Sequence, residues 1–560
     1  MKASASLVSL CTIFPASLFG LSADEASRPN PPGESRAPDR AVRSEPDSEG
    51  GVKAGKDDVL LAALRGVAVA PSAEAALNLQ QKSKDGVIVE GFSDQETAAI
   101  REIVDPVVGK PVSLRSLEQL TGQLEVAFRS SGRPFMQVSF PPQEITTGVI
   151  GIVIRPARVG QVLLSGNPAF GAKFAAQAFR TRPGEEVSGD TVVEDLEWIN
   201  ENSLRRASIS YADGESPDTL DLTLRLAAKR TWRVYAGIDN QLSNDLGDER
   251  LFIGFQYGDL FSLDHRITAQ YTSALNPTDL QGVSGIYEVP LPWRHLAEIS
   301  LGYTESESKN SGPIDQSGQF SRLALGYRVP LPRWHLISQE WRMGLEFRNN
   351  DYTFSNSPPE TVKFFNIETG WKGRLFDSFG MTRLDASVSY NPGKGVFGSS
   401  DDDYIALGAS GAESVVGRFE FERTLKIGKE ATLVSRSRAQ WANSALLSSD
   451  QLSSGGYNRV RGFDETVGYA STGVVTALEL QSRFYPAPRF GTFQGVTFFD
   501  AAALHRDEDT DAGQLASVGV GVRWRYEEML SARMDLGIPV DYPDDLDGDP
   551  RIEFSFSVSW

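Results

Sequence analysis

The C-terminal stretch Arg551-Ile552-Glu553-Phe554-Ser555-Phe556-Ser557-Val558-Ser559-Trp560 alternates polar and apolar residues along its whole length. A period of two residues is typical of a β-strand with one apolar and one polar face. In a strand that closes a membrane barrel, the apolar face contacts lipid, the polar face lines the lumen, and an aromatic residue lies at the interface. The pattern therefore predicts a barrel-closing strand, with Phe554, Phe556 and Trp560 as the membrane-insertion terminus.

A long series of segments with the same alternation precedes this strand. From Lys229 onward we count about sixteen, each near the roughly ten residues that a tilted membrane strand needs. They are 230–241, 249–260, 264–275, 280–290, 295–306, 318–330, 337–349, 360–373, 380–391, 414–427, 430–443, 472–485, 492–504, 514–525, 530–540 and 551–560. Short turns and long loops broadly alternate between them, as in outer-membrane barrels. We therefore expect an all-β transmembrane barrel of antiparallel strands over residues 229–560.

Bulk composition agrees with this interpretation. The net charge of −19 argues against a nucleic-acid binder, because counterion release needs a surplus of Lys and Arg. A mean hydropathy of −0.26 and the lack of a long apolar run exclude a bundle of membrane helices.

The N-terminus predicts export. Lys2 and the apolar, Ser-rich run that follows resemble a secretory signal, which we assign to residues 1–23. Cys11, the only cysteine, lies inside it, so the mature chain has neither a disulfide framework nor a cysteine metal site. Residues 24–60 are rich in Pro, Ser, Gly and charged residues and predict a disordered tether. The one helical candidate before the first folded unit is 57–64, which begins in the tether and extends past its end.

Residues 61–228 have the texture of a soluble α/β region, and its order of elements occurs twice. The first unit, 61–157, and the second, 158–228, each predict a strand, helices and a closing hairpin. The first unit's expected elements are strands at 65–69, 87–89, 135–140 and 149–154 and helices at 94–104 and 114–130. The second unit's are strands at 159–164, 207–211 and 220–226 and helices at 174–179 and 191–200.

Turn and cap residues in these two units resemble those of POTRA domains, the periplasmic modules that precede outer-membrane transport barrels. Each residue alone is a structural turn or cap residue, and the resemblance lies in their order. The matching residues are Pro142, Gln143 and Gly148 in the first unit, and Pro183, Gly184, Asn200, Gly214 and 219–222 in the second.

The long loop 445–471 contains a candidate functional motif, Val460-Arg461-Gly462-Phe463. An arginine between apolar residues is unusual at a solvated loop tip, and a loop folded into the lumen needs a carboxylate for that guanidinium. Asp500 offers one. Alternation leaves two registers for its strand, and the one that points Asp500 inward is favoured because a carboxylate facing lipid is penalised.

These residues also carry a family resemblance. Residues 460–463 match the Val-Arg-Gly-Phe/Tyr motif, and Phe498–Asp500 match the Phe-x-Asp-x-Gly motif, of the POTRA-barrel transporter superfamily; Ala502 replaces the usual glycine. Asp239-Asn240, Glu479, two POTRA units and the terminal aromatic resemble its two-partner secretion branch, the hemolysin secretion/activation family. The resemblance implies that the motif loop reaches into the barrel and that Arg461 pairs with Asp500. An N-terminal plug helix, frequent in that family, has no clear counterpart here.

The resemblance implies an outer-membrane pore with periplasmic POTRA domains, which moves an unfolded exoprotein to the cell surface without nucleotide hydrolysis. Its partners would be that exoprotein, outer-membrane lipid and the barrel-assembly machinery that inserts it. A POTRA sheet edge can bind an extended chain by β-augmentation. The edges expected to do so are 135–140, with Phe135, Val138 and Phe140, and 207–211, with Ile209.

Three alternatives remain open at this point: a barrel-assembly factor, a passive or polysaccharide channel, and an enzyme. The sequence has no Gly-x-Ser-x-Gly, His-Glu-x-x-His or phosphate-loop motif, and its four histidines are scattered at strand ends, so an enzyme is the least favoured and no cofactor or metal is expected. The acidic run Asp401–Asp403 has the composition of a cation site, but such runs are more often solvated loops.

Overall fold

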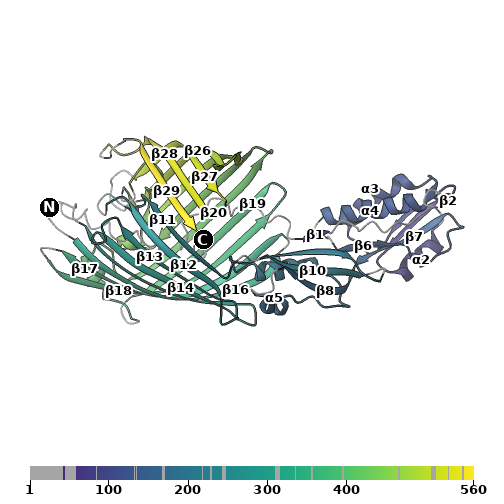
Figure 1. Cartoon of the computed structure of the whole chain (residues 1–560), viewed down its shortest axis with the longest axis horizontal. Coiled ribbons are helices and arrows are strands. Elements are labelled where there is room, and N and C mark those ends of the chain that lie inside the picture. Colours follow the sequence, from purple (N-terminus) through teal and green to yellow (C-terminus); the bar gives the residue numbers. More distant parts are fainter. Residues whose placement is uncertain are drawn as a thin grey trace. The chain divides into compact units, whose positions relative to one another are not determined.

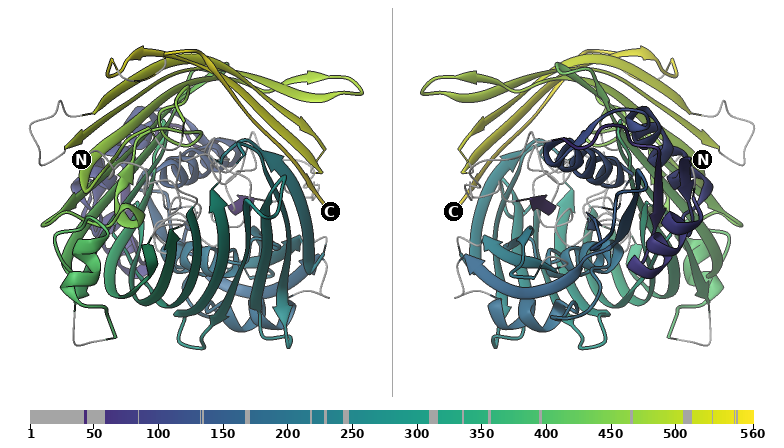
Figure 2. Two further views of the ribbon diagram at one scale, coloured as in Figure 1. Left: turned by 90° about the vertical axis from the view of Figure 1, so that its left-hand side faces the viewer. Right: turned by 90° about the vertical axis from the view of Figure 1, so that its right-hand side faces the viewer.

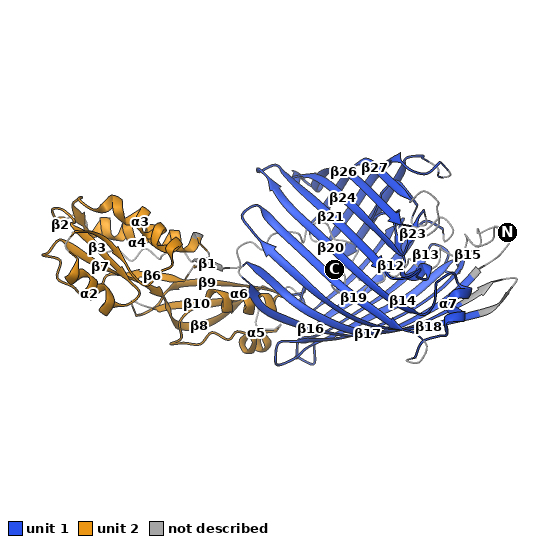
Figure 3. Cartoon of the chain, turned by 180° about the vertical axis from the view of Figure 1, so that it is seen from behind, with its two compact units in different colours: residues 1–39, 202–204, 230–560 blue, residues 40–201, 205–229 orange. Residues whose placement is uncertain are grey.

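The computed structural model describes residues 42–44 and 59–560, apart from 84, 132, 134, 167–170, 217–218, 228–229, 243–246, 309–315, 335, 355–356, 394–396, 465–466, 506–512, 528, 545 and 547. The predicted signal peptide and nearly all of the predicted tether lie outside the described residues. The chain forms two compact units, one of residues 40–201 and 205–229, and the other containing residues 202–204 and 230–560 (Figure 3). No helix among the described residues is long and apolar enough to span a membrane.

The first half of the smaller unit is a four-stranded sheet with helices packed on it. The sheet order is β4-β3-β7-β6, with β3 parallel to β4 and β7 and with β6 antiparallel to β7. The elements are β3 (Gly66–Ala70), α2 (Ala73–Lys82), β4 (Gly86–Val89), α3 (Asp94–Val104), α4 (Leu114–Ser130), β6 (Met136–Ser139) and β7 (Val149–Pro156). The sequence predicted all of these except α2, whose short run buries only Ala76, Leu79 and Gln80 and so has a weak helical period.

The helical candidate at 57–64 is wrong over its described part. Val59–Leu61 forms a short strand, β2, that pairs with β5 (Val112–Ser113). Its two leading side chains are exposed, so no apolar face holds a helix there.

The second half of this unit repeats the arrangement with fewer helices. Its elements are β8 (Arg158–Gly166), α5 (Ala172–Ala178), α6 (Gly189–Ile199), β9 (Arg206–Asp213) and β10 (Thr219–Ala227). The sheet order is β1-β9-β10-β8, in which β8 is parallel to β10 and β9 and β10 form the antiparallel hairpin. The added edge strand, β1 (Val42–Ser44), is the described part of the N-terminal segment and runs parallel to β9.

Two of the residues that resemble POTRA positions share one structural role. The Gln143 carboxamide donates to the Gly151 carbonyl at 2.8 Å and accepts from the Gly151 N–H at 2.6 Å. The Asn200 carboxamide does the same for Ala207, donating at 3.0 Å and accepting at 2.6 Å. Each side chain therefore imitates a strand partner and fixes a loop or helix end against a strand.

We expect Asn200→Ala to lower the free energy of unfolding of the smaller unit by about 2 kcal/mol, because two hydrogen bonds of about 1 kcal/mol each are lost at the start of β9. Urea unfolding of residues 40–229, expressed alone, measures this. Asn200→Gln, which keeps the chemistry on a longer side chain, serves as the comparison. An unchanged unfolding midpoint in Asn200→Ala would show that the carboxamide is dispensable.

The larger unit is a closed antiparallel β-barrel, whose strands run from teal to yellow in Figures 1 and 2. Its strands are β11 (Trp232–Asp239), β12 (Arg250–Leu260), β13 (His265–Ala274), β14 (Leu280–Pro290), β15 (Leu296–Ser308), β16 (Gln316–Trp334), β17 (Ile337–Phe354), β18 (Ser357–Phe376), β19 (Gly380–Pro392), β20 (Glu413–Ile427), β21 (Ala431–Ala442), β24 (Thr472–Ser482), β26 (Gly491–His505), β27 (Gln514–Tyr526), β28 (Leu530–Asp541) and β29 (Arg551–Ser559). The three-residue β25 (Tyr485–Ala487) extends the β24 side of the turn before β26. These sixteen strands confirm the predicted series.

The last strand closes the barrel, as its sequence pattern predicted. β29 pairs antiparallel with β28 on one side and with β11 on the other, from Tyr235 opposite Ser559 to Asp239 opposite Ser555. Ile552, Phe556 and Trp560 are exposed on the outer face, whereas Glu553 is buried toward the lumen. The same alternation appears on β27, where Val518, Val520 and Val522 are exposed and Ser517 and Arg523 are buried.

Candidate functional site

The loop between β21 and β24 is folded against the inner wall of the barrel. Within it, β22 (Leu452–Ser453) pairs with β23 (Tyr469–Ala470), and Val460 and Phe463 are almost fully buried. An apolar cluster joins the loop to strands β24, β26 and β27; it consists of Leu452, Val460, Phe463 and Ala470 from the loop and Val475, Ala502, Leu504 and Leu515 from the wall. Burial of these side chains stabilises the inward position of the loop.

Arg461 lies at the centre of this contact, with only 2% of its surface exposed. Its Nε and Nη2 donate to the two carboxylate oxygens of Asp500 at 2.6 and 2.8 Å, and its backbone N–H donates to the same carboxylate at 3.2 Å. Nη1 donates to Glu479 at 2.7 Å. The guanidinium also stacks on Phe498, with its carbon 3.5 Å from the ring centroid. A bidentate pair with a stacked ring fixes both the position and the plane of the guanidinium.

Further arginines balance the carboxylates around Arg461. Asp535 on β28 is 3.4 Å from Nη1 of Arg461, and it accepts from Arg523 at 2.5 Å and from Arg533 at 2.6 Å. Glu479 has a second cation at 3.6 Å in Arg436. Each buried charge thus has opposite charges in contact, which is what makes its desolvation tolerable. Removal of one arginine leaves buried carboxylates with too little compensation.

A close backbone contact lies beside Arg461. Gly462 has a φ of +90°, and a Cβ built on it would lie 2.9 Å from the Gly537 carbonyl carbon of β28. A Cβ on Gly537 would lie 2.7 Å from the carbonyl carbon of Arg461. The Gly462 N–H donates to Glu553 at 3.1 Å. Only a pair of glycines allows the loop and the strand to approach this closely.

The structure brings the predicted motif residues together. Asp500 is fully buried on the lumen side while Phe499 is 46% exposed on the outer face, so the strand has the register that points Asp500 inward. The motif residues Val460, Arg461, Gly462 and Phe463 all meet the wall next to Phe498 and Asp500. Ala502, at the position where glycine is usual in the family motif, packs in the apolar cluster with Phe463, so its methyl group fits there.

Sequence reasoning missed the residues contributed by the last strands. Asp535 and Gly537 of β28 and Glu553 of β29 complete the site, together with Arg523 and Arg533. Their signal was the polar stripe of each strand: Arg533, Asp535 and Gly537 alternate with the apolar residues that face outward, such as Met534 and Ile538. Alternation places these charged residues on the lumen face, but it does not show which of them lie near the motif.

The two expected POTRA edges differ in their environment. β6 is an edge strand of its sheet, and Val138 on it directs its N–H away from β7, to the Glu125 carboxylate at 3.4 Å. The side chains of Phe135 and Phe140 do not stand free at this edge: Phe135 packs edge-to-face on Tyr211, with ring centroids 5.3 Å apart, and Phe140 packs against the core of the first half. Ile209 is buried in the core of the second half, and β1 occupies the outer edge of its strand, β9.

The acidic run at 401–403 has a local structural role. It begins α7 (Asp401–Ala406), where Asp403 and Ser400 form a capping box, and Asp401 accepts from the Ala412 N–H at 2.9 Å. Within the described ranges no group of three or more His, Cys, Asp or Glu side chains is arranged to hold a metal ion. Capping of a helix N-terminus accounts for carboxylates at this position.

Two family models match the chain. The model described as haemolysin secretion/activation protein ShlB/FhaC/HecB matches residues 218–524, and the model described as POTRA domain, ShlB-type, matches residues 84–156. The first match covers more than half of the chain and includes the loop motif and the Asp500 strand.

Individual relatives and a solved structure are also similar. The outer membrane transporter CdiB-2 of Burkholderia pseudomallei is 22% identical over 69% of this chain and 67% of its own length. The heme/hemopexin transporter protein HuxB of Haemophilus influenzae is 25% identical over 29% of each chain. The structure of CdiB from Escherichia coli superposes with a TM-score of 0.68 at 17% identity and covers 92% of this chain and 94% of its own. At that identity the superposition supports the fold.

Proposed function

Since the chain belongs to the haemolysin secretion/activation protein ShlB/FhaC/HecB family, we propose that it binds one unfolded exoprotein through its POTRA domains and passes it through the barrel to the cell surface. The chain is an outer-membrane transporter, with the barrel in the outer membrane and the POTRA domains in the periplasm. The relatives named above are transporters as well.

The observation that carries this proposal is the motif loop held inside a closed barrel by the Arg461–Asp500 pair. A passive pore has no need of a buried guanidinium with several carboxylate partners, because such a site costs desolvation without contributing to diffusion. A loop held at a fixed position by a directional contact can instead restrict the lumen at rest and shift when a polypeptide enters. We assign this role to residues 460–463, with Asp500 and Phe498 as their partners on the barrel wall.

Recognition of the exoprotein is assigned to the edge of β6. An unpaired strand edge binds an extended chain through backbone hydrogen bonds, so affinity depends little on side-chain sequence and the cargo must be unfolded. Binding by this route needs no nucleotide, because the free energy comes from the new backbone pairing and from folding of the cargo outside. Val138 contributes the outward N–H, which an incoming strand competes for with Glu125.

The edge of β9 is assigned a second, conditional role. In the structure β1 takes this edge, with Val42 opposite Ile209 and Ser44 opposite Tyr211. An exoprotein strand therefore reaches β9 only after β1 has left it, whereas β6 has an edge with no strand partner among the described residues. This difference makes β6 the first docking position.

We expect Val138→Pro to reduce export of the exoprotein by about tenfold, because proline removes the outward backbone donor at the centre of the β6 edge. Export is measured as the amount of exoprotein in the medium relative to the amount in cells. Val138→Ala is the matched control, since it truncates the same buried side chain but keeps the N–H.

The comparison of these two variants separates recognition from folding. Equal losses in Val138→Pro and Val138→Ala would mean that the core of the domain is responsible. Parental export by Val138→Pro, with the full-length chain correctly inserted, would rule out β6 as the docking edge.

A further inference from the structure

The motif loop has a second attachment point, which precedes its tip in the chain. At its start, the short helical turn η3 (Ser448–Asp450) and the preceding Leu447 lie against the barrel wall and the α7 loop, residues 397–412. Leu447 is buried in an apolar cluster with Val362, Phe364, Tyr404, Ala409 and Ala412. The base of the loop therefore has contacts with the wall in addition to those of the Arg461 site.

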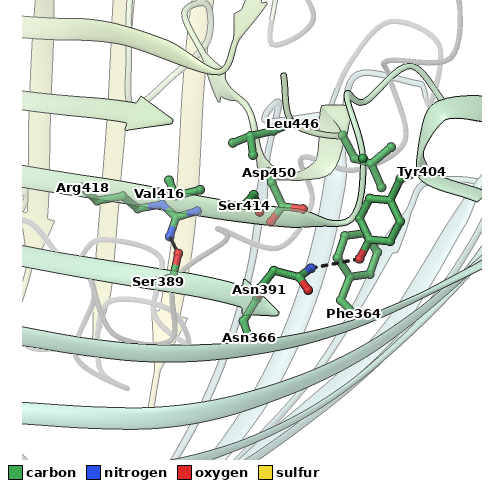
Figure 4. Close-up of a pocket in the computed structure, with 12 residues that line it drawn as sticks. Phe364, Asn366, Ser389, Asn391, Tyr404, Ser414, Val416, Arg418, Leu446 and Asp450 are labelled. Atoms are coloured by element: carbon green, nitrogen blue, oxygen red, sulfur yellow. Dashed lines mark hydrogen bonds between the residues drawn. The ribbon is translucent and has the colours of Figure 1, made fainter. Parts of the chain in front are cut away.

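An ion pair accompanies this packing, and its acidic member, Asp450, is labelled in Figure 4. The two carboxylate oxygens of Asp450 accept from Nη2 of Arg348, on β17, at 2.6 and 2.7 Å. Arg348 also stacks on Phe364, with its guanidinium carbon 4.2 Å from the ring centroid. The Asp450 carbonyl accepts from the Gln440 side chain at 2.8 Å. Asp450 is thus held both by its side chain and by its backbone.

The α7 loop forms the other side of this attachment and is itself fixed to the wall. The Tyr404 hydroxyl accepts from Asn391 at 3.0 Å and donates to the Lys363 carbonyl at 3.3 Å, and its ring packs edge-to-face on Phe364. The Ser410 N–H donates to the Ala445 carbonyl at 3.0 Å, and the Ala445 N–H donates to the Ser410 hydroxyl at 3.2 Å. The base of the motif loop is therefore bonded to a rigid neighbour.

The two attachment points use different strands. The tip contacts β24, β26 and β28 through Glu479, Asp500 and Asp535. The base contacts β17 and β18 through Arg348 and Phe364. Motion of the loop thus requires either that both points release or that the tip turns about a base that stays fixed.

We propose that Arg348 and Asp450, with the Tyr404 cluster, form a base anchor that positions the motif loop so that Arg461 reaches its carboxylates; this rests on the function proposed above. The anchor acts through its contacts and not by shortening the loop. Freeing residues 443–450 lengthens the mobile segment so little that closure entropy changes the docking equilibrium by less than about twofold. A hydrogen-bonded charged pair changes such an equilibrium by about tenfold or more.

The test uses Asp450→Asn and a single-cysteine reporter of loop position. Ser454, in the motif loop, is fully buried, and its N–H donates to the Gly468 carbonyl at 2.9 Å. Ser454→Cys in a Cys11→Ser background is labelled by a membrane-impermeant maleimide only when the loop leaves the wall. We expect Asp450→Asn to raise the labelling rate about tenfold and to raise the KCl conductance of the purified protein in planar bilayers.

Two further variants serve as a control and as a second change in the anchor. Asp402→Asn makes the same change of charge on the exposed face of α7 and is expected to behave as the parent. Arg348→Lys keeps the charge but has a shorter side chain and loses the planar guanidinium that stacks on Phe364, so it is expected to raise labelling as well. It also supplies the test if Asp450→Asn fails to give the heat-modifiable, folded barrel.

Comparison with Arg461→Ala distinguishes this inference from the proposed function. Faster labelling in Arg461→Ala with parental labelling and conductance in folded Asp450→Asn and Arg348→Lys would overturn the base anchor alone. Parental labelling in Arg461→Ala itself would overturn the role of the motif loop on which the anchor depends. Faster labelling in all three, with Asp402→Asn unchanged, supports the anchor.

Discussion

Arg461→Ala is expected to reduce export at least about a hundredfold while the barrel still inserts. The substitution leaves the buried carboxylates of Asp500 and Glu479 without their central cation, and breaking a buried ion pair from one side costs about 3–5 kcal/mol. Because a tenfold change in an equilibrium constant corresponds to about 1.4 kcal/mol, the docked position of the loop loses at least two orders of magnitude in population. The strands themselves keep their backbone pairing, so the barrel is expected to persist.

The amount of exoprotein in the medium measures export, and heat-modifiable migration of the barrel on a gel measures whether the barrel has folded. Asn458→Ala, at an exposed position of the same loop, is the control and is expected to export as the parent. Asp500→Asn removes the charge of the partner with little change in shape and is expected to fall between the two. Undiminished export by a folded Arg461→Ala protein would exclude the motif loop from the mechanism.

Gly537→Ala is expected to displace the loop tip although it changes no charge. Its new methyl group would meet backbone atoms of Arg461 and Gly462, and backbone cannot move aside as the end of a flexible side chain does. Overpacking of this kind costs about 1–3 kcal/mol, so we expect export to fall at least about fivefold. Gly417→Ala on β20 is the matched control, because a Cβ there meets only a ring atom of Trp441 at 3.9 Å.

Labelling of the Ser454→Cys reporter shows whether the loss arises from loop displacement. Faster labelling and lower export in Gly537→Ala, with Gly417→Ala unchanged, would agree with the close approach of the two glycines. Parental labelling and export in Gly537→Ala would mean that the loop accepts the extra methyl group and that its position is less restricted than the structure implies.

The barrel was predictable because each strand carries its own signal. Alternation such as that of residues 552–560 indicates which side chains face lipid, and this assignment needs no information about distant strands. β29 pairs with β11 and closes the barrel, as the pattern of residues 551–560 predicted. The POTRA elements were predictable from helical and strand periods, except where a short helix such as α2 buries only three side chains.

The candidate site was predictable only in part, for a physical reason. Arg461 in an apolar setting requires a carboxylate partner, and inward-facing Asp500 satisfies that requirement locally. Asp535 and Glu553 also face inward, but so do many charged residues of the barrel, and which of them meet the loop depends on the register of several strands. The pairing of β1 with β9 was equally inaccessible, because three residues in a polar segment carry no strand period.

The most direct test of the central claim compares the secreted and outer-membrane proteins of the host with and without the gene for this chain, together with the Arg461→Ala allele. A dedicated exporter predicts that one large exoprotein disappears from the medium in both mutant strains while all other outer-membrane barrels keep their abundance. A general decrease of outer-membrane barrels, with no single exoprotein lost, would contradict the account.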